Sequence, residues 1–339
     1  MTLDRRVLLA GLPGVLAACS QQPASKPASV RTPIRFATDW RAEVEHGGFY
    51  QAQASGEYAR RGLDVRIIQG GPGSNVPQLL ASGATDLGVG SNALQVLSLA
   101  AEQVPVKAVM AVFQKDPQVL MAHPGTGVRT LADLKGRPIL LSDAAVTSFW
   151  PWLKARYGLT DAQVRKYSGS PAAFIADDQA IQQGYVFSEP LTVKAAAKFK
   201  PVTLLLADAG YPGYAGMVLA PQTLLTGRPD AVRAFVAASA QGWKDYLWGD
   251  PRSADALIKV DNPEMTDALL DQGRGMLRTY GIVGSGDAQT LGLGAMSDAG
   301  WAKVAKMAAD AKLYPKTPDV REAYSLDFLP AGSASKKKA

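Results

Sequence analysis

Short apolar runs alternate with amphipathic segments along the first third of the chain, starting at Ile34. The runs are rich in aliphatic and β-branched residues and are mostly bounded by Asp, Gly or Pro, a pattern typical of buried strands. Four runs predict strands, over residues 34–38, 63–68, 85–90 and 106–113. The segments between them predict helices, near residues 48–61, 75–82 and 92–102. This alternation predicts an α/β fold whose strands are mainly parallel.

A second unit repeats the layout of the first. PILLSDAAVTSFWPWLKARYGL (138–159) has the strand, the Ser/Thr-Asp turn, the helix and the Gly-Leu exit of the stretch 34–63. AAFIADDQAIQQGYVFSEP (172–190) is related in the same way to PQLLASGATDLGVGSN (77–92). Two such units predict two lobes. The alternative is that any two α/β units share this layout.

The pattern becomes helical after about Met217, where apolar residues recur at intervals of three and four. Four segments predict helices, over residues 229–248, 251–260, 263–282 and 297–313. We expect these helices to cover one lobe, built from residues 33–122 and 216–330, with residues 123–215 forming the other. The chain would then cross between lobes near 121–124 and return near 212–216, which makes these two segments the hinge.

Polar residues follow several of the predicted strands. In open parallel sheets, ligands bind beyond the carboxyl ends of the strands. Side chains at those ends should therefore meet in one cleft between the lobes. They are Asp39, Trp40, Ser91, Asn92, Asp143, Ser188 and Glu189.

The N-terminus predicts export. Arg5 and Arg6 precede an apolar run over residues 7–18 that is too short for a permanent membrane span. The run ends in Leu-Ala-Ala-Cys19, which resembles the lipobox of bacterial lipoproteins, and this resemblance implies that Cys19 is acylated after cleavage. An uncleaved signal anchor, or a cleavage site with a chance cysteine, is the alternative. Residues 20–32 are rich in Pro, Ser and Ala and predict a flexible tether.

Composition excludes several classes of function. Lys and Arg exceed Asp and Glu by 36 to 30, but much of the excess lies at the two ends, including the tail 331–339, which we expect to be disordered. A nucleic-acid partner is therefore not expected. Cys19 is the only cysteine and there are two histidines, so we expect no metal site and no cofactor. We also expect no catalytic residues, because no nucleophile motif occurs.

The stretch DWRAEVEHGGFYQA (39–52) holds the densest group of candidate ligand contacts. Trp40 offers a flat face for a ring, or is a core residue. Asp39 and the two following glutamates argue against an anionic ligand, unless the glutamates are solvated loop charges. Gly47 begins a helix, whose free N–H groups can meet a ligand oxygen. His46 and Tyr50 complete the candidates in this stretch.

Further candidates lie along both predicted lobes. Asn75, Asn92 and Gln95 are hydrogen-bonding residues of the cleft, or helix caps and surface residues.

The aromatic pair Phe149 and Trp150 would close on a ring from the second lobe, or pack in its core. Glu189 would meet an amino group of the ligand, or is a charge at a helix N-terminus. Tyr214 contacts the ligand at the hinge, or packs between the lobes.

Several stretches together carry a family resemblance. They are the lipobox, DW…EHGGFYQA, YARRGLDVRI, GGPGSN, LLASGATDLGVGSN and LADLKGRPI. Over residues 33–330 the chain resembles substrate-binding proteins of bacterial ABC importers, in the group of thiamine-pyrimidine-precursor binders related to nitrate, sulfonate and taurine binders. The resemblance implies a two-lobed periplasmic-binding-protein fold of type 2, each lobe a mainly parallel sheet flanked by helices, with two hinge crossings.

The resemblance also implies a function. In the pyrimidine binders a Trp after the first strand stacks on the ring and a Glu before a Pro meets its amino group, and the matching residues here are Trp40 and Glu189. Where that group has DWTPNTNH this chain has DWRAEVEH, so only the Asp, the Trp and the His persist. The expected function is capture of a small nitrogen heterocycle for import, without enzymatic activity.

The expected protein is a monomer, lipid-anchored in the cell envelope and facing the periplasm, that docks on ABC-transporter permease subunits. Three alternatives remain: an anion importer with Arg41 or Arg129 in the cleft, a sensory lobe that presents the ligand to a receptor, and a pyrimidine-synthesis enzyme of the same fold. That enzyme uses a cysteine-rich iron motif, which this chain lacks.

Overall fold

The computed structural model describes residues 31–316 and 318–330. These residues form one compact unit. The predicted leader with Cys19, most of the predicted tether and the basic tail lie outside the described residues. None of the helices within residues 31–316 and 318–330 has the length and apolar character of a membrane span.

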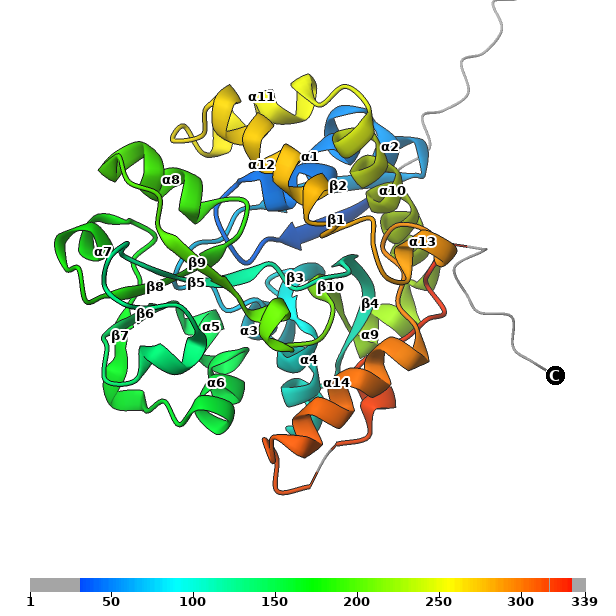
Figure 1. The fold of residues 1–339 in the computed structure, drawn as a ribbon. Coiled ribbons are helices and arrows are strands. Elements are labelled where there is room, and N and C mark those ends of the chain that lie inside the picture. Colours follow the sequence, from blue (N-terminus) through cyan, green and yellow to red (C-terminus); the bar gives the residue numbers. More distant parts are fainter. Residues whose placement is uncertain (1–30, 317, 331–339) are drawn as a thin grey trace, which may run out of the picture. The chain divides into compact units, whose positions relative to one another are not determined.

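The first sheet has five strands in the order β2-β1-β3-β10-β4 (Figure 1). Their bounds are β1 Thr32–Ala37, β2 Leu63–Ile68, β3 Leu87–Asn92, β4 Val106–Phe113 and β10 Ala215–Pro221. β1 pairs in parallel with β2 and β3, whereas β10 is antiparallel to both β3 and β4. The predicted bounds of β2 and β4 are confirmed, and β3 begins two residues later than predicted.

The second sheet has the order β7-β6-β8-β5-β9. Its strands are β5 Gln118–Ala122, β6 Ile139–Leu141, β7 Val164–Lys166, β8 Ile181–Tyr185 and β9 Val202–Leu205. β6 is parallel to β7 and β8, and β5 is antiparallel to β8 and β9. In each sheet, four strands therefore run the same way and one is opposed, so the sheets are mixed although mainly parallel.

The two sheets confirm the predicted repeat, since β1, β2 and β3 occupy the same places as β6, β7 and β8. The opposed strand of each sheet follows the last strand of the other: β5 comes after β4, and β10 comes after β9. The predicted first crossing near 121–124 is wrong, because residues 118–122 already pair within the second sheet. The chain crosses over residues 114–117 and returns over 206–214.

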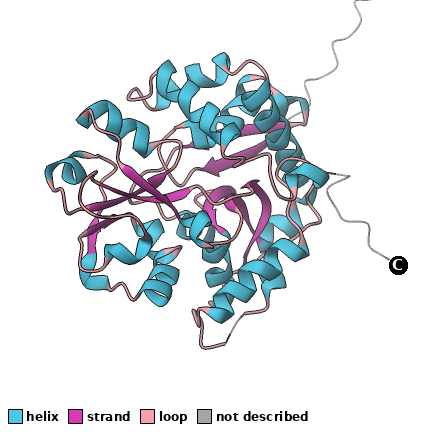
Figure 2. Ribbon diagram, viewed as in Figure 1, coloured by secondary structure: helices cyan, strands magenta, loops and turns pink. Residues whose placement is uncertain are grey.

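Helices flank both sheets (Figure 2). Those between the strands of the first sheet are η1 Val44–His46, α1 Gly47–Ala54, α2 Glu57–Arg60, α3 Val76–Ala81 and α4 Ala93–Ala101. The single helix predicted near 48–61 is interrupted at Gly56, whose φ of 76° is left-handed and is readily adopted by glycine. Those of the second sheet are η2 Leu131–Leu134, α5 Asp143–Thr147, α6 Trp150–Tyr157, η3 Asp161–Gln163, α7 Ala172–Ala176, α8 Glu189–Ala197 and η4 Leu206–Ala209.

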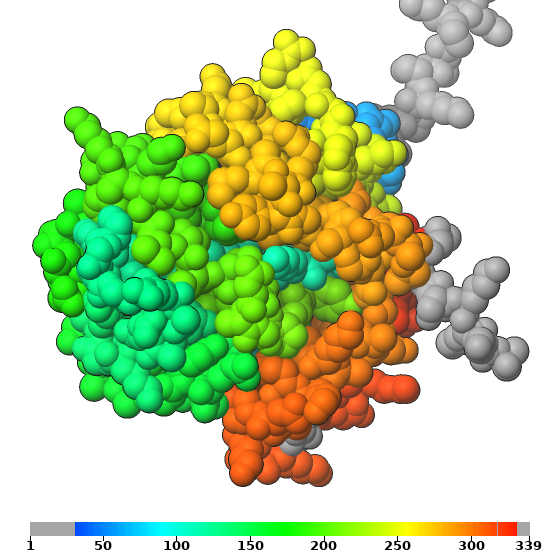
Figure 3. Space-filling model, viewed as in Figure 1, coloured from blue at the N-terminus to red at the C-terminus, as the bar shows by residue number. Residues whose placement is uncertain are grey.

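The helical prediction for the C-terminal part is confirmed. The elements are α9 Gln222–Gly227, α10 Pro229–Trp248, α11 Arg252–Asp261, α12 Asp267–Thr279, α13 Ala288–Leu291, α14 Asp298–Asp310 and η5 Val320–Glu322. α10 and α11 pack on α1, and α14 packs on α4, so these helices cover elements of the first sheet. In the space-filling view they form the yellow to orange surface, next to the green surface of the second-sheet residues (Figure 3).

Candidate ligand-binding site

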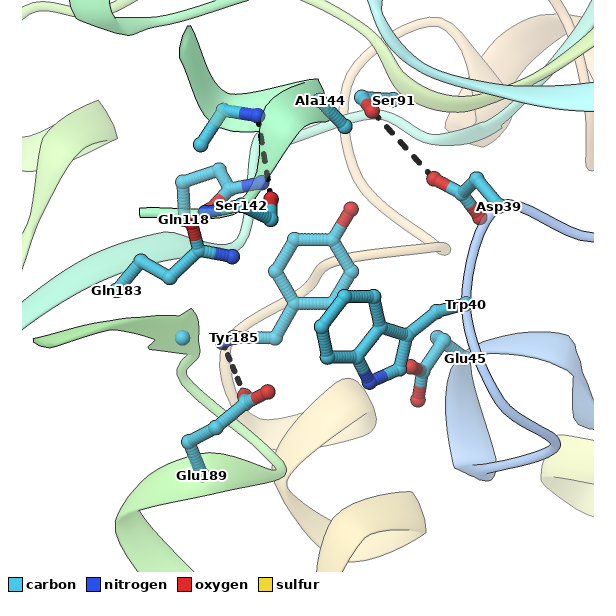
Figure 4. Close-up of a pocket in the computed structure, with 12 residues that line it drawn as sticks. Asp39, Trp40, Glu45, Ser91, Gln118, Ser142, Ala144, Gln183, Tyr185 and Glu189 are labelled. Carbon is cyan, nitrogen blue, oxygen red and sulfur yellow. Dashed lines mark hydrogen bonds between the residues drawn. The ribbon is translucent and has the colours of Figure 1, made fainter. Parts of the chain in front are cut away.

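A cavity lies where strands of both sheets end (Figure 4). The space between its walls, open mouth included, is about 420 Å³. The first-sheet side contributes residues after β1, in η1 and at the end of β3, and the second-sheet side contributes residues around β5, β6 and β8. The lining residues are Asp39, Trp40, Glu45, Ser91, Gln118, Ser142, Ala144, Ala145, Gln183, Gly184, Tyr185 and Glu189.

Asp39 follows β1 and is held by two neighbours. His46 Nε2 lies 3.2 Å from Asp39 Oδ1, and Ser91 Oγ donates to Asp39 Oδ2 at 3.5 Å. His46 Nδ1 lies 3.1 Å from the carbonyl oxygen of Arg41, so both ring nitrogens have partners inside the protein. His46 is buried behind the cavity and orients Asp39, while Asp39 and Ser91 line the cavity.

Trp40 is half-buried and lies at the contact between the lobes. Its ring stacks on that of Tyr167, which follows β7 of the second sheet, with 5.8 Å between ring centroids and 11° between planes. Tyr185, also from the second sheet, lines the cavity near Trp40 (Figure 4). The indole of Trp40 thus lines the cavity and also packs on a side chain of the opposite lobe, and its contact with a ligand stays a prediction.

The alternative that the two glutamates of the 39–52 stretch are solvated is wrong. Glu43 is 9% exposed and Glu45 is 5% exposed. Ser188 Oγ of the second lobe donates to Glu43 Oε2. Burial raises the pKa of Glu43, and burial together with repulsion from Glu43 and Glu189 raises the pKa of Glu45 well above its usual range.

Glu189 begins α8 and faces the cavity from the second lobe. The backbone N–H of Tyr185 donates to Glu189 Oε2 at 2.7 Å. Burial, with repulsion from Glu43, raises the pKa of Glu189 to about 8. The carboxyl groups of Asp39, Glu45 and Glu189 thus line one cavity from both lobes.

Most of the lining residues from the second sheet were not predicted from the sequence. Gln118 was hidden by the misplaced crossing. Ser142 and Gln183 are joined by a bond from Ser142 N to Gln183 Oε1 at 2.6 Å. The repeat was a usable signal for Ser142, because this residue follows β6 as Thr38 follows β1.

Two candidates from the 39–52 stretch lie away from the cavity. A Cβ on Gly47 would lie 2.1 Å from ring carbons of Tyr246, so this glycine allows α1 to pack against α10. Tyr50 is buried, and its hydroxyl donates to Asp261 Oδ2 at 2.6 Å. Both residues serve helix packing.

The amide candidates cap helices or bond within the protein. Asn75 Oδ1 accepts from Gln78 N at the start of α3. Asn92 Oδ1 accepts from Gln95 N at the start of α4, and Asn92 Nδ2 donates to Asp116 at 3.2 Å. Gln95 Oε1 accepts from Ser91 N at 2.9 Å and so orients a residue that lines the cavity.

The remaining candidates are structural. Asp143 is exposed and pairs with Lys166 at 2.7 Å. Phe149 is fully buried, and Trp150 is buried with its Nε1 donating to Asp161 Oδ1 at 2.7 Å, so core packing explains both. The Tyr214 hydroxyl donates to Asp287, away from the cavity.

Among the described residues that line the cavity, none is lysine, arginine or histidine. Arg41 Nη1 pairs with Glu264 at 3.1 Å, and the guanidinium lies beside Gly169. Arg129 lies in an exposed turn where its backbone N–H donates to Asp133. Neither arginine forms part of the cavity wall.

Comparisons with known proteins identify a family and several relatives of the chain. Residues 43–254, more than half of the chain, match the family model described as NMT1/THI5 like. A riboflavin-binding protein, RibY of Chloroflexus aurantiacus, is 25% identical over 97% of this chain and 99% of its own length. A 4-amino-5-hydroxymethyl-2-methylpyrimidine phosphate synthase of Legionella pneumophila is 20% identical over 89% of this chain and 94% of its own length.

Solved structures confirm the fold. The alkanesulfonate-binding protein SsuA from Xanthomonas axonopodis pv. citri, bound to MOPS, superposes with a TM-score of 0.62 at 17% identity. The superposition covers 89% of this chain and 99% of that protein. The fold is therefore the two-lobed periplasmic-binding-protein fold of type 2, as predicted.

Proposed function

This chain belongs to the NMT1/THI5-like family, and we propose that it is the solute-binding component of an ABC importer that captures a small, flat nitrogen heterocycle between its lobes. In this proposal the protein is exported, anchored through acylated Cys19 and monomeric, and it delivers its ligand to permease subunits. The two lobes would close over the ligand, as hinged binding proteins do.

The observation that carries the proposal is the composition of the cavity wall. It combines an indole, from Trp40, with three carboxyl groups, and no basic side chain of the described residues takes part in it. An aromatic face suits a flat ring, and carboxylates accept hydrogen bonds from its amino or ring N–H groups. A sulfonate or nitrate would find no basic side chain of the described residues in this wall to balance its charge, which argues against the anion importer.

The relatives agree with this class of ligand. One is named for riboflavin and the other for a pyrimidine, and both compounds are flat nitrogen heterocycles. An enzymatic role finds less support in this chain. His46 is bonded behind the cavity, and His123 packs between Phe174 and Phe199 with its Nε2 on a backbone carbonyl.

A thermal-shift screen tests the proposal on the protein lacking residues 1–19. Riboflavin, 4-amino-5-hydroxymethyl-2-methylpyrimidine, nucleobases, alkanesulfonates and nitrate would be compared at equal concentration. A ligand that binds only the folded protein stabilises it by about 2.7 kcal/mol at a hundredfold excess over Kd. We expect at least one heterocycle to raise the melting temperature. Stabilisation by sulfonates or nitrate alone would contradict the proposal.

Replacing Trp40 by alanine should weaken binding of the heterocycle found in that screen about tenfold, because the ring loses its stacking face. Trp40→Phe keeps an aromatic face and should lose less. Calorimetric titration of both variants measures the effect. Unchanged affinity in Trp40→Ala would show that the indole does not contact the ligand.

The ring centroids of Trp40 and Tyr167 are 5.8 Å apart, which leaves no room for a third ring between them. A bound ring would therefore contact the part of Trp40 that lines the cavity, or the lobes would have to separate to admit it.

The proposed anchor has its own test. Changing Cys19 to serine in the full chain should move the protein from the membrane fraction to the soluble fraction, since a serine cannot carry the thioether-linked lipid. Fractionation followed by immunoblotting measures this. Retention of Cys19→Ser in the membrane fraction would show that acylation is not what holds the protein there.

A further inference from the structure

The cavity wall has more acceptor oxygens than the protein supplies donors for. Glu45 Oε2 and Gln118 Oε1 have no hydrogen-bond partner among the described residues. Glu45 is 5% exposed and Gln118 is 6% exposed, and both line the cavity. A buried acceptor without a donor is costly, so this arrangement calls for a ligand that brings donors.

The charge in and around the cavity is also one-sided. Glu43 is not among the lining residues, and after burial its repulsion is the second cause that raises the pKa of both Glu45 and Glu189. The other ionisable groups that face them are Asp39, Arg41, His46, Tyr167 and Tyr185. Of the two bases, Arg41 is paired with Glu264 and His46 with Asp39. When no ligand is bound, Glu45 and Glu189 reduce their mutual repulsion by keeping their carboxyl protons.

A metal ion does not fit this arrangement. Across residues 31–316 and 318–330, no three His, Cys, Asp or Glu side chains converge to hold one. The carboxyl groups around the cavity belong instead to Asp39 after β1, Glu45 in η1 and Glu189 at the start of α8. Separated carboxylates suit an organic cation, which carries several N–H donors and spreads its charge over a larger volume.

We propose that the solute binds as an organic cation, a heterocycle with a protonated amino group directed at Glu45 and Glu189, and that its binding expels protons from this pair into solution. This inference rests on the proposed function and narrows its ligand class. The ligand ammonium donates to the carboxylate oxygens, and each proton displaced from a carboxyl group goes to the buffer. Binding should therefore strengthen as the pH rises from 6 to 8, while the ligand keeps its charge.

A matched pair of pyrimidines tests this. 4-Amino-5-aminomethyl-2-methylpyrimidine carries an ammonium group at pH 7, where the 5-hydroxymethyl compound has a neutral hydroxyl of similar size. We expect the aminomethyl compound to bind about tenfold more tightly. Its binding enthalpy should differ between phosphate and Tris buffers by the amount that proton release requires, and the hydroxymethyl compound should show no such difference.

Two variants complete the experiment. Glu45→Gln removes one ionisable group at nearly constant shape, and it should reduce both the preference for the ammonium and the proton release. Asp143→Asn removes an exposed carboxylate outside the cavity and should change neither. The melting temperature of each variant reports whether it folds.

The outcomes separate the two proposals. If the hydroxymethyl compound or riboflavin binds as tightly as the aminomethyl compound, or if no protons are released, the cation inference is overturned and heterocycle binding stands. If only sulfonates or nitrate bind, or if no compound binds, both proposals fail.

Discussion

Replacing Gly242 by alanine is expected to lower the free energy of unfolding by about 3 kcal/mol. A Cβ at this position of α10 would lie 2.2 Å from the carbonyl oxygen of Gly48 and 2.8 Å from the backbone nitrogen of Ala52. These are backbone atoms of α1, so the clash can be relieved only by moving one helix relative to the other. α1 follows directly on η1, which carries Glu45, so its displacement would also disturb the cavity.

Gly275→Ala is the matched control for Gly242→Ala. Gly275 also lies within a helix, α12, but a Cβ there would meet no atom within 4 Å. Alanine is the better helix former, so this variant should be up to about 1 kcal/mol more stable than the natural protein. Denaturant unfolding of both variants makes the comparison. Equal stability of Gly242→Ala and the natural protein would show that α1 and α10 are not tightly packed at this point.

Glu189→Gln is expected to make the unliganded protein more stable at pH 8.5 by about 2 kcal/mol, with little effect at pH 5. The pKa of Glu189 rises from 4.5 to about 8 on folding. The folded protein therefore binds more protons than the unfolded chain between these values, and its stability falls as the pH rises through this window. A neutral glutamine avoids that loss, and its side-chain oxygen can still accept the hydrogen bond from Tyr185 N.

The expected gain is smaller than the full pKa change implies, because Glu43 and Glu45 share the repulsion with Glu189. Denaturant unfolding at pH 5 and pH 8.5 measures the effect. Asp143→Asn, which removes a carboxylate on the surface, serves as the control and should change the free energy of unfolding little at either pH. If Glu189→Gln is no more stable than the natural protein at pH 8.5, then ionisation of Glu189 does not destabilise the folded protein and its pKa is not raised on folding.

These two variants probe different requirements of one site. The packing of α1 on α10 fixes the position of η1 and therefore of Glu45. The carboxyl groups of the cavity repel one another when they are ionised, unless a cationic ligand binds or they become protonated. A site that is destabilised when empty at high pH gains most from a cationic ligand under those conditions. Measurement of unfolding with and without the aminomethyl pyrimidine would link the two effects.

The choice among the candidate residues depended on contacts across the lobes. Glu45 and His46 are adjacent in sequence, yet Glu45 lines the cavity and His46 bonds behind it. Glu43 receives its hydrogen bond from Ser188, 145 residues away. No local pattern distinguishes these three ionisable residues, because their roles depend on which side chains the second lobe brings against them.

By itself, the sequence determined most of the elements, the repeat and the two-lobed fold. The apolar periodicity predicts the bounds of the strands over residues 63–68 and 106–113 and of the helix over 229–248, because it reflects which face of each segment is buried. The sequence also identified Asp39, Trp40, Ser91 and Glu189 as candidates, because they lie at or after the ends of predicted strands, and all four line the cavity.

Only the tertiary structure decided which sheet β5 joins, and therefore that Gln118 reaches the cavity. The periodicity of a strand records that it is buried, but its partners in β8 and β9 are set by pairing with distant residues. The tertiary structure also assigned Gly47, Tyr50, Phe149 and Trp150 to packing, because the same glycine or aromatic side chain serves a ligand or a neighbouring helix according to what lies opposite it.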